Sequence, residues 1–310
     1  MKSIRVLITG DCNANCPTCI NRNIRKANKF MTLDTFSKLC RYFETNKVKN
    51  IRIMGGEPTI HPDFEEIMYV AQQHFERVTL FTNGINEKIS LFSPREKDGI
   101  NYNFLFSNKL NRNKLLTDKP GNRTLELLVT KDINIDKTKD ELLRVIAFSP
   151  NTLAVSLTFD CTANIFKERE ILIKHFTLIQ DFLEQEKIDY LTDHSMPICF
   201  VYGSKIPIRK GGSLCGGDCA GMIDSECQLH FCNQFSNETL SIYEKGNFLP
   251  YSILENHLTY AHLKNQIIVL EKICLDCPYY NKYCNGGCFM ASEKISKEDV
   301  LSNTQFPISD

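Results

Sequence analysis

Three cysteines near the start of the chain, Cys12, Cys16 and Cys19, have the spacing of a metal site. The C-x3-C-x2-C pattern, called the cysteine triplet below, can direct three thiolates into one site, one ligand short of a closed tetrahedral site. Soft thiolates favour zinc or iron–sulfur clusters, and no fourth ligand is evident beside the triplet. The pattern therefore predicts a metal site with an open coordination position. A partial zinc site and scattered structural thiols are the alternatives.

A second motif, Gly55-Gly56-Glu57-Pro58, follows the next predicted strand. The two motifs together, each after its own strand, resemble the radical S-adenosylmethionine (SAM) superfamily. This resemblance implies that Cys12, Cys16 and Cys19 hold a [4Fe–4S] cluster whose fourth iron binds SAM. It also implies reductive cleavage of SAM to a 5′-deoxyadenosyl radical, which abstracts a hydrogen atom from the substrate.

Further residues are predicted to contact the cofactor. Glycines let a ligand approach the backbone closely, and a glutamate accepts hydrogen bonds from an ammonium group. The resemblance accordingly implies that Gly55 to Pro58 contact the amino group of SAM. Thr82-Asn83-Gly84 resembles a segment that borders the SAM and substrate site in relatives acting on peptides, although Asn-Gly is also an ordinary turn signal. Ser156 is a candidate ribose or substrate contact, with a structural hydroxyl as the alternative.

The C-terminal part of the chain is rich in cysteine. The run C-x2-C-x6-C-x3-C from residue 274 to 288 resembles the auxiliary-cluster extension called SPASM, with one additional residue in its middle spacing. The eighth cysteine of that family is missing here. Three interpretations remain open: Cys227 replaces it, the outer of two auxiliary clusters has an open iron, or only one auxiliary cluster exists. Paired cysteines also suit zinc. The implied ligands are Cys215, Cys219, Cys232 and Cys288 for one [4Fe–4S] cluster, and Cys274, Cys277 and Cys284 for another.

Apolar runs rich in β-branched residues alternate with helical patterns over the first two thirds of the chain. With right-handed crossovers they predict an α/β fold, a partial (β/α)6 TIM-like barrel that is open on one side. Active sites of such barrels lie at the C-terminal ends of the strands, so the three N-terminal motifs are predicted to meet on one rim. The predicted strands are 4–9, 50–54, 78–82, 102–106, 125–130 and 153–159.

Helices are predicted between these strands. Pro62 favours a helix start, and Thr138 with Glu141 forms a capping box that predicts another. Residues 85–100 contain turn signals and are predicted to form a loop or a short stub. The predicted domains are a radical SAM core barrel in 1–205 and a small SPASM-like auxiliary Fe–S domain in 206–310. One helical face carries Phe36, Leu39, Cys40 and Phe43.

The overall charge balance gives no reason to expect nucleic acid or an anionic membrane as a partner. Lys and Arg number 37, as do Asp and Glu. The N-terminus lacks the apolar core of a signal peptide, and no apolar run reaches membrane-spanning length. We therefore expect a cytoplasmic protein, in a compartment that keeps its 14 cysteines reduced.

Relatives with auxiliary clusters mostly modify peptides or proteins. The resemblance thus implies a peptide maturase that crosslinks, epimerises or oxidises residues, with a flavodoxin- or ferredoxin-type electron donor and auxiliary clusters that handle substrate or electrons. Cys161 is a candidate hydrogen-atom donor or substrate contact, with ordinary packing as the alternative. The alternative functions are a radical SAM dehydrogenase or epimerase acting on a sugar or nucleotide, and a non-catalytic iron–sulfur or zinc protein.

Overall fold

The chain folds into two units in the computed structural model. One comprises residues 1–126, 143–154 and 218–259, and the other comprises 127–142, 155–217 and 260–310. Within the described part of the chain, no helix is both long and apolar enough to cross a membrane. The residues that the structure describes are 3–16, 19, 21–22, 29–103, 121–147, 153–159, 165–192, 198–201, 204, 220–232 and 235–269.

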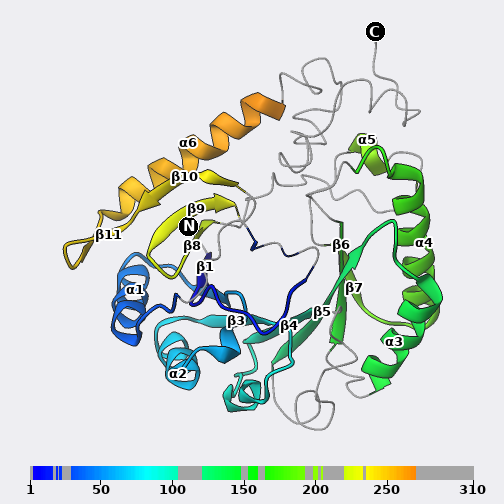
Figure 1. The fold of residues 1–310 in the computed structure, drawn as a ribbon, viewed down its shortest axis with the longest axis horizontal. Coiled ribbons are helices and arrows are strands. Elements are labelled where there is room, and N and C mark those ends of the chain that lie inside the picture. Colours follow the sequence, from blue (N-terminus) through cyan, green and yellow to red (C-terminus); the bar gives the residue numbers. More distant parts are fainter. Residues whose placement is uncertain are drawn as a thin grey trace. The chain divides into compact units, whose positions relative to one another are not determined.

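A mostly parallel sheet forms the centre of the first unit (Figure 1). β1 (Ser3–Leu7), β2 (Asn50–Met54), β3 (Arg77–Thr82), β4 (Gly99–Asn103) and β5 (Asn122–Val129) pair in sequence order, each parallel to the next. On the other side of β1 lies β8 (Ala220–Ile223), also parallel, followed by antiparallel β9 (Gln228–Cys232) and β10 (Phe235–Ser241). The predicted α/β architecture with parallel strands is confirmed. The addition of β8 beside β1 was not predicted.

Helices α1 (Leu33–Thr45) and α2 (Phe64–His74) lie side by side outside this sheet (Figure 1). The side chain of Thr32 accepts a hydrogen bond from the Thr35 N–H (3.1 Å) and so caps α1. Short 3-10 turns η1 (Pro58–Ile60) and η2 (Glu87–Leu91) follow β2 and β3, and η2 agrees with the stub predicted for 85–100. As predicted, the buried face of α1 consists of Phe36, Leu39, Cys40 and Phe43.

Helix α2 starts two residues later than the sequence predicted, because a histidine organises the turn before it. His61 Nδ1 accepts the Asp63 backbone N–H (3.0 Å), while Nε2 donates to the Met31 carbonyl (2.9 Å). Pro62 therefore lies in a turn rather than at the first helical position. Burial lowers the pKa of His61, so the ring is held neutral between these two partners.

The second unit contains a parallel pair of strands packed with aromatic side chains. β6 (Leu153–Phe159) pairs with β7 (Tyr190–Thr192), and α4 (Arg169–Gln185) lies between them in sequence. Phe159 stacks on Phe176 of α4 with ring centroids 5.1 Å apart. Phe200 of α5 (Ile198–Val201) meets the Phe159 ring edge-on at 5.4 Å.

The predicted capping box of the helix after β5 is wrong. α3 (Ile135–Ala147) begins earlier, because the side chain of Asn134 accepts the Lys137 N–H (2.9 Å) and caps the first turn. Thr138 is a buried residue inside the helix.

A small hairpin and a long helix complete the described elements. β11 (Tyr243–Glu244) pairs with β12 (Asn247–Phe248), and α6 (Tyr251–Val269) follows. Phe248 stacks on Tyr42 of α1, with ring centroids 4.9 Å apart, and the Tyr42 hydroxyl donates to the Leu249 carbonyl (2.9 Å). The segment after β10 is therefore attached to α1.

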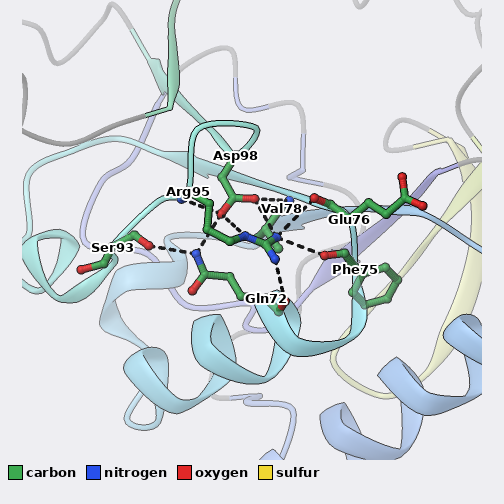
Figure 2. A network of polar contacts seen from close by, with 7 residues as sticks. All are labelled: Gln72, Phe75, Glu76, Val78, Ser93, Arg95 and Asp98. Atoms are coloured by element: carbon green, nitrogen blue, oxygen red, sulfur yellow. Dashed lines mark hydrogen bonds and ion pairs between the residues drawn. The ribbon is translucent and has the colours of Figure 1, made fainter.

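A polar network fixes the start of β4 (Figure 2). The fully buried Asp98 accepts hydrogen bonds from the Val78 backbone N–H (2.9 Å), from the Gln72 amide (2.8 Å) and from the backbone and guanidinium of Arg95. Burial alone would raise the pKa of Asp98, but these hydrogen bonds outweigh it and lower the pKa. The network explains why β4 begins at Gly99, three residues before the predicted start.

We predict that Asp98→Asn lowers the free energy of unfolding by about 3 kcal/mol. The asparagine keeps one acceptor oxygen, but its NH2 group would face the donors that met the other oxygen, and the Arg95 guanidinium would lose its ionised partner. The ionised Asp98 stabilises the fold above the ordinary pKa of an aspartate. This contribution is lost as the pH falls through the lowered pKa of the folded state. Urea unfolding at several pH values measures both effects.

The control for this prediction is Glu76→Gln, which removes an exposed pair with Lys49 and should change stability little. Equal unfolding free energies for Asp98→Asn and Glu76→Gln would show that the network does not stabilise the fold.

Candidate functional site

The cysteine triplet lies in the loop after β1, with all three side chains partly buried and none in a disulfide. The loop is held by Arg22, whose backbone N–H donates to the Cys19 carbonyl (3.2 Å) and whose guanidinium donates to the Cys16 carbonyl (2.7 Å). Within the described residues, no three Cys, His, Asp or Glu side chains are placed to hold a single metal ion. The triplet therefore remains a predicted ligand set.

The two glycines after β2 pack directly against the backbone that leads into the triplet. The Gly56 N–H donates to the Thr9 carbonyl (2.9 Å), and the Glu57 N–H donates to the Asp11 carbonyl (2.7 Å). A Cβ on Gly56 would lie 2.0 Å from the Asp11 oxygen, and one on Gly55 would lie 2.7 Å from the Thr9 oxygen. From the sequence, these glycines were expected to let a ligand approach the backbone closely. In the structure the close approach is made by the chain itself.

Glu57 is 1% exposed, and its carboxylate is surrounded by protein donors. One oxygen accepts from the Thr59 N–H (3.1 Å), the Thr59 hydroxyl (2.6 Å) and the Thr82 hydroxyl (2.7 Å). The other accepts from the Asn83 backbone N–H (2.7 Å). Burial raises the pKa of Glu57, and these hydrogen bonds oppose the rise. Glu57 therefore fixes the end of β3 relative to the end of β2.

Asn83 connects this carboxylate to the triplet. Its side-chain Nδ2 lies 2.7 Å from Asn13 Oδ1 and 4.0 Å from Cys12 Sγ, while its Oδ1 accepts the Ile85 N–H (3.0 Å). The triplet loop, the Gly55–Pro58 segment and the Thr82–Gly84 segment are thus joined by hydrogen bonds. The prediction that the three motifs meet on one rim is confirmed.

The structure describes only some of the other predicted site residues. Ser156 is buried on β6 in the second unit, and Pro58 is buried at the start of η1. Cys232 is the last residue of β9. The remaining predicted residues lie outside the described part of the chain, namely Cys161, Cys215, Cys219, Cys274, Cys277, Cys284 and Cys288.

Cys227 lies in the β8–β9 turn, 2% exposed and with a φ of 60°. This left-handed conformation is one that glycine usually adopts. Burial, with Asp224 nearby, raises the pKa of Cys227 to about 12. Its assignment as an auxiliary-cluster ligand remains a prediction.

Asp224 at this turn forms a buried pair with His230 of β9 that the sequence did not predict. His230 Nε2 lies 2.9 Å from the Asp224 carboxylate, which also accepts the Glu226 and Gln228 N–H groups. Nδ1 of His230 has no hydrogen-bond partner within the described residues. Because β8 runs parallel to β1, the turn lies at the same edge of the sheet as the triplet loop, and Glu226 pairs with Lys29 after that loop (3.1 Å). The only signal in the sequence is the turn-forming Asp-Ser.

We predict that Glu57→Gln lowers the free energy of unfolding by about 1 to 3 kcal/mol, since an amide N–H would face the Asn83 N–H donor. The end of β3 should then move relative to the triplet, and iron bound after anaerobic reconstitution should fall. Denaturant unfolding and iron analysis measure the two effects. Glu44→Gln, which alters a more exposed pair with His74, is the control. Unchanged stability and iron content in Glu57→Gln would contradict the role assigned to this carboxylate.

Comparisons with known proteins agree with this geometry. The family model of the Radical SAM superfamily matches residues 6–115. A probable GTP 3′,8-cyclase of Methanothermobacter marburgensis is 34% identical over 83 residues, which are 26% of this chain and 27% of that protein. A probable GTP 3′,8-cyclase of Methanococcus maripaludis is 28% identical over 171 residues, 53% of this chain and 52% of that protein. The matches therefore span about half of these curated relatives, or less.

Solved structures share the fold at low sequence identity. The crystal structure of Streptococcus suis SuiB bound to S-adenosylmethionine matches with a TM-score of 0.63 and 14% identity, over 96% of this chain and 75% of that chain. SuiB bound to the precursor peptide SuiA matches with a TM-score of 0.55 and 12% identity, over 79% of this chain and 63% of that chain. At this identity the similarity shows the fold alone.

Proposed function

We propose that this chain, which contains a radical SAM domain in residues 6–115, abstracts a hydrogen atom from a peptide or protein substrate. The observation that carries the assignment of radical SAM chemistry is the hydrogen-bonded connection from Glu57 through Asn83 to Cys12. It joins the three motifs of the domain at one end of the parallel strands, where barrel enzymes have their active sites.

The residues present fit a [4Fe–4S] cluster with SAM, because three thiols from one loop are soft donors and none is in a disulfide. Cys12, Cys16 and Cys19 would hold the cluster. When bound, the cluster and SAM supply a 5′-deoxyadenosyl radical for hydrogen abstraction. The chain itself positions the triplet loop, because Gly55 and Gly56 allow this loop to pack against the end of β2.

A peptide substrate is supported by the fold shared with SuiB, which was solved with the precursor peptide SuiA. The cysteine-rich tail supports auxiliary clusters that handle electrons or substrate, with a flavodoxin- or ferredoxin-type donor as the source of electrons. The division into a core in 1–205 and an auxiliary domain in 206–310 is part of this proposal.

A small-molecule substrate is the second candidate, favoured by the relatives named as GTP 3′,8-cyclases. In this case the same radical chemistry acts on a nucleotide or sugar. The match covers 27% of the Methanothermobacter marburgensis protein and 52% of the Methanococcus maripaludis protein, so about half or more of each relative has no counterpart in the match.

Deuterium transfer distinguishes these candidates. The anaerobically reconstituted full chain is incubated with SAM, dithionite and an extract of source cells grown in deuterated medium, and 5′-deoxyadenosine is analysed by mass spectrometry. The proposal predicts 5′-deoxyadenosine that carries deuterium, and predicts that protease treatment of the extract removes the deuterium. Deuterium that survives protease, or that is supplied by deuterated GTP alone, supports the second candidate. Absence of any 5′-deoxyadenosine contradicts both.

A further inference from the structure

Asn83 is the first residue after β3 and is 6% exposed. Its backbone N–H is held by Glu57 (2.7 Å), and its side-chain oxygen accepts the Ile85 N–H (3.0 Å). The backbone N–H of Asn83 is thus held by the carboxylate after β2, and its side-chain oxygen is held by the turn after β3. The direction of the side-chain NH2 group follows from these two contacts, because the amide is planar.

The NH2 group faces the triplet loop. An amide nitrogen carries two hydrogens, and Asn83 Nδ2 has two neighbours there. Asn13 Oδ1 lies at 2.7 Å, and Cys12 Sγ lies at 4.0 Å. The contact with Asn13 also orients the contact with Cys12. When one hydrogen of the NH2 group points at Asn13 Oδ1, the other is available for the adjacent sulfur.

We propose that Asn83 tunes the reduction potential of a cluster bound through Cys12 by donating an N–H hydrogen bond to its thiolate sulfur. This inference rests on the proposed function. Adding one electron makes a thiolate-ligated cluster more negative, and a hydrogen-bond donor at the sulfur stabilises the more negative state. Asn83 therefore raises the potential, and dithionite or a flavodoxin-type donor reduces the cluster more readily. Asn83 is a positioning residue in this role, since it acts through Cys12.

The variant that isolates this contact is Asn83→Ser. A serine hydroxyl can still accept the Ile85 N–H, and the backbone N–H to Glu57 is kept, but both amide hydrogens are removed. The matched control is Asn86→Ser, because Asn86 makes the same kind of turn with Lys88 (3.0 Å) and its amide donates to the Thr59 carbonyl (3.2 Å). The measurement is a redox titration of the anaerobically reconstituted full chain, followed by electron paramagnetic resonance. The signal that changes on addition of SAM identifies the relevant cluster.

The expected result for Asn83→Ser is a reduced-to-oxidised ratio about tenfold lower at the same solution potential, which is a downward shift of about 59 mV for a one-electron couple. Asn83→Asp should shift the potential further down, since it places a negative charge near the sulfur. If Asn83→Ser does not assemble the cluster, the reduction potential of Asn83→Asp tests the inference in its place. The inference is overturned if the reduction potential of the Asn83 variant equals that of Asn86→Ser. Failure of the proposed function is a different outcome of this experiment, namely a wild-type chain that shows no SAM-sensitive signal.

Discussion

Simultaneous replacement of Cys12, Cys16 and Cys19 by alanine is expected to reduce 5′-deoxyadenosine formation below detection. The three thiols are the predicted ligands of the SAM-binding cluster, and alanine offers no donor for iron. The side chains are only partly buried, so the variant should retain its fold and its thermal unfolding temperature within a few degrees. Mass spectrometry of the reaction with SAM and dithionite measures the effect.

The matched control is Cys40→Ala, which removes a thiol buried on α1. Burial raises the pKa of Cys40, as expected of a cysteine that packs in the core, and the variant should keep its activity while losing about 1 kcal/mol of stability. Turnover that persists in the triple variant would show that the triplet does not hold the catalytic cluster.

Gly56→Ala is expected to lower the free energy of unfolding by about 3 kcal/mol and to prevent cluster assembly. The new Cβ would lie 2.0 Å from the Asp11 carbonyl oxygen, a backbone atom that cannot move without displacing the loop that carries the triplet. Denaturant unfolding measures the stability, and iron and sulfide analysis after reconstitution measures the assembly.

The control is Gly99→Ala, whose Cβ would meet nothing closer than 3.5 Å. This variant should bind iron as the wild type does. Normal stability and normal iron content in Gly56→Ala would mean that the contact between the glycine segment and the triplet loop is not required.

The sequence predicted the central strands because their apolar periodicity is local, and β1, β2, β3, β5 and β6 lie within a few residues of the expected ranges. The misplaced boundaries depend on side chains that act on backbone groups. Asn134 moves the start of α3, and His61 delays the start of α2. Residue spacing does not reveal such contacts, since they depend on the orientation of one side chain.

The site was predictable to the level of its motifs. The spacing of the triplet and the Gly55–Pro58 segment indicated residues that the structure brings together. The engagement of the Glu57 carboxylate by Thr59, Thr82 and Asn83 was not predictable, because it depends on how the end of β3 meets the end of β2. The pairing of β8 with β1 likewise joins residues more than 200 positions apart, a contact that no local pattern encodes.

The proposed function depends on a [4Fe–4S] cluster held by Cys12, Cys16 and Cys19, with an open iron that binds SAM. Electron–nuclear double resonance of the reduced, reconstituted chain with SAM labelled with 15N at its amino group tests it most directly. We expect a nitrogen coupling to the cluster that is present in the wild type and absent in the triple alanine variant. A reconstituted wild-type protein whose cluster shows no such coupling, or whose triplet holds zinc, would contradict it.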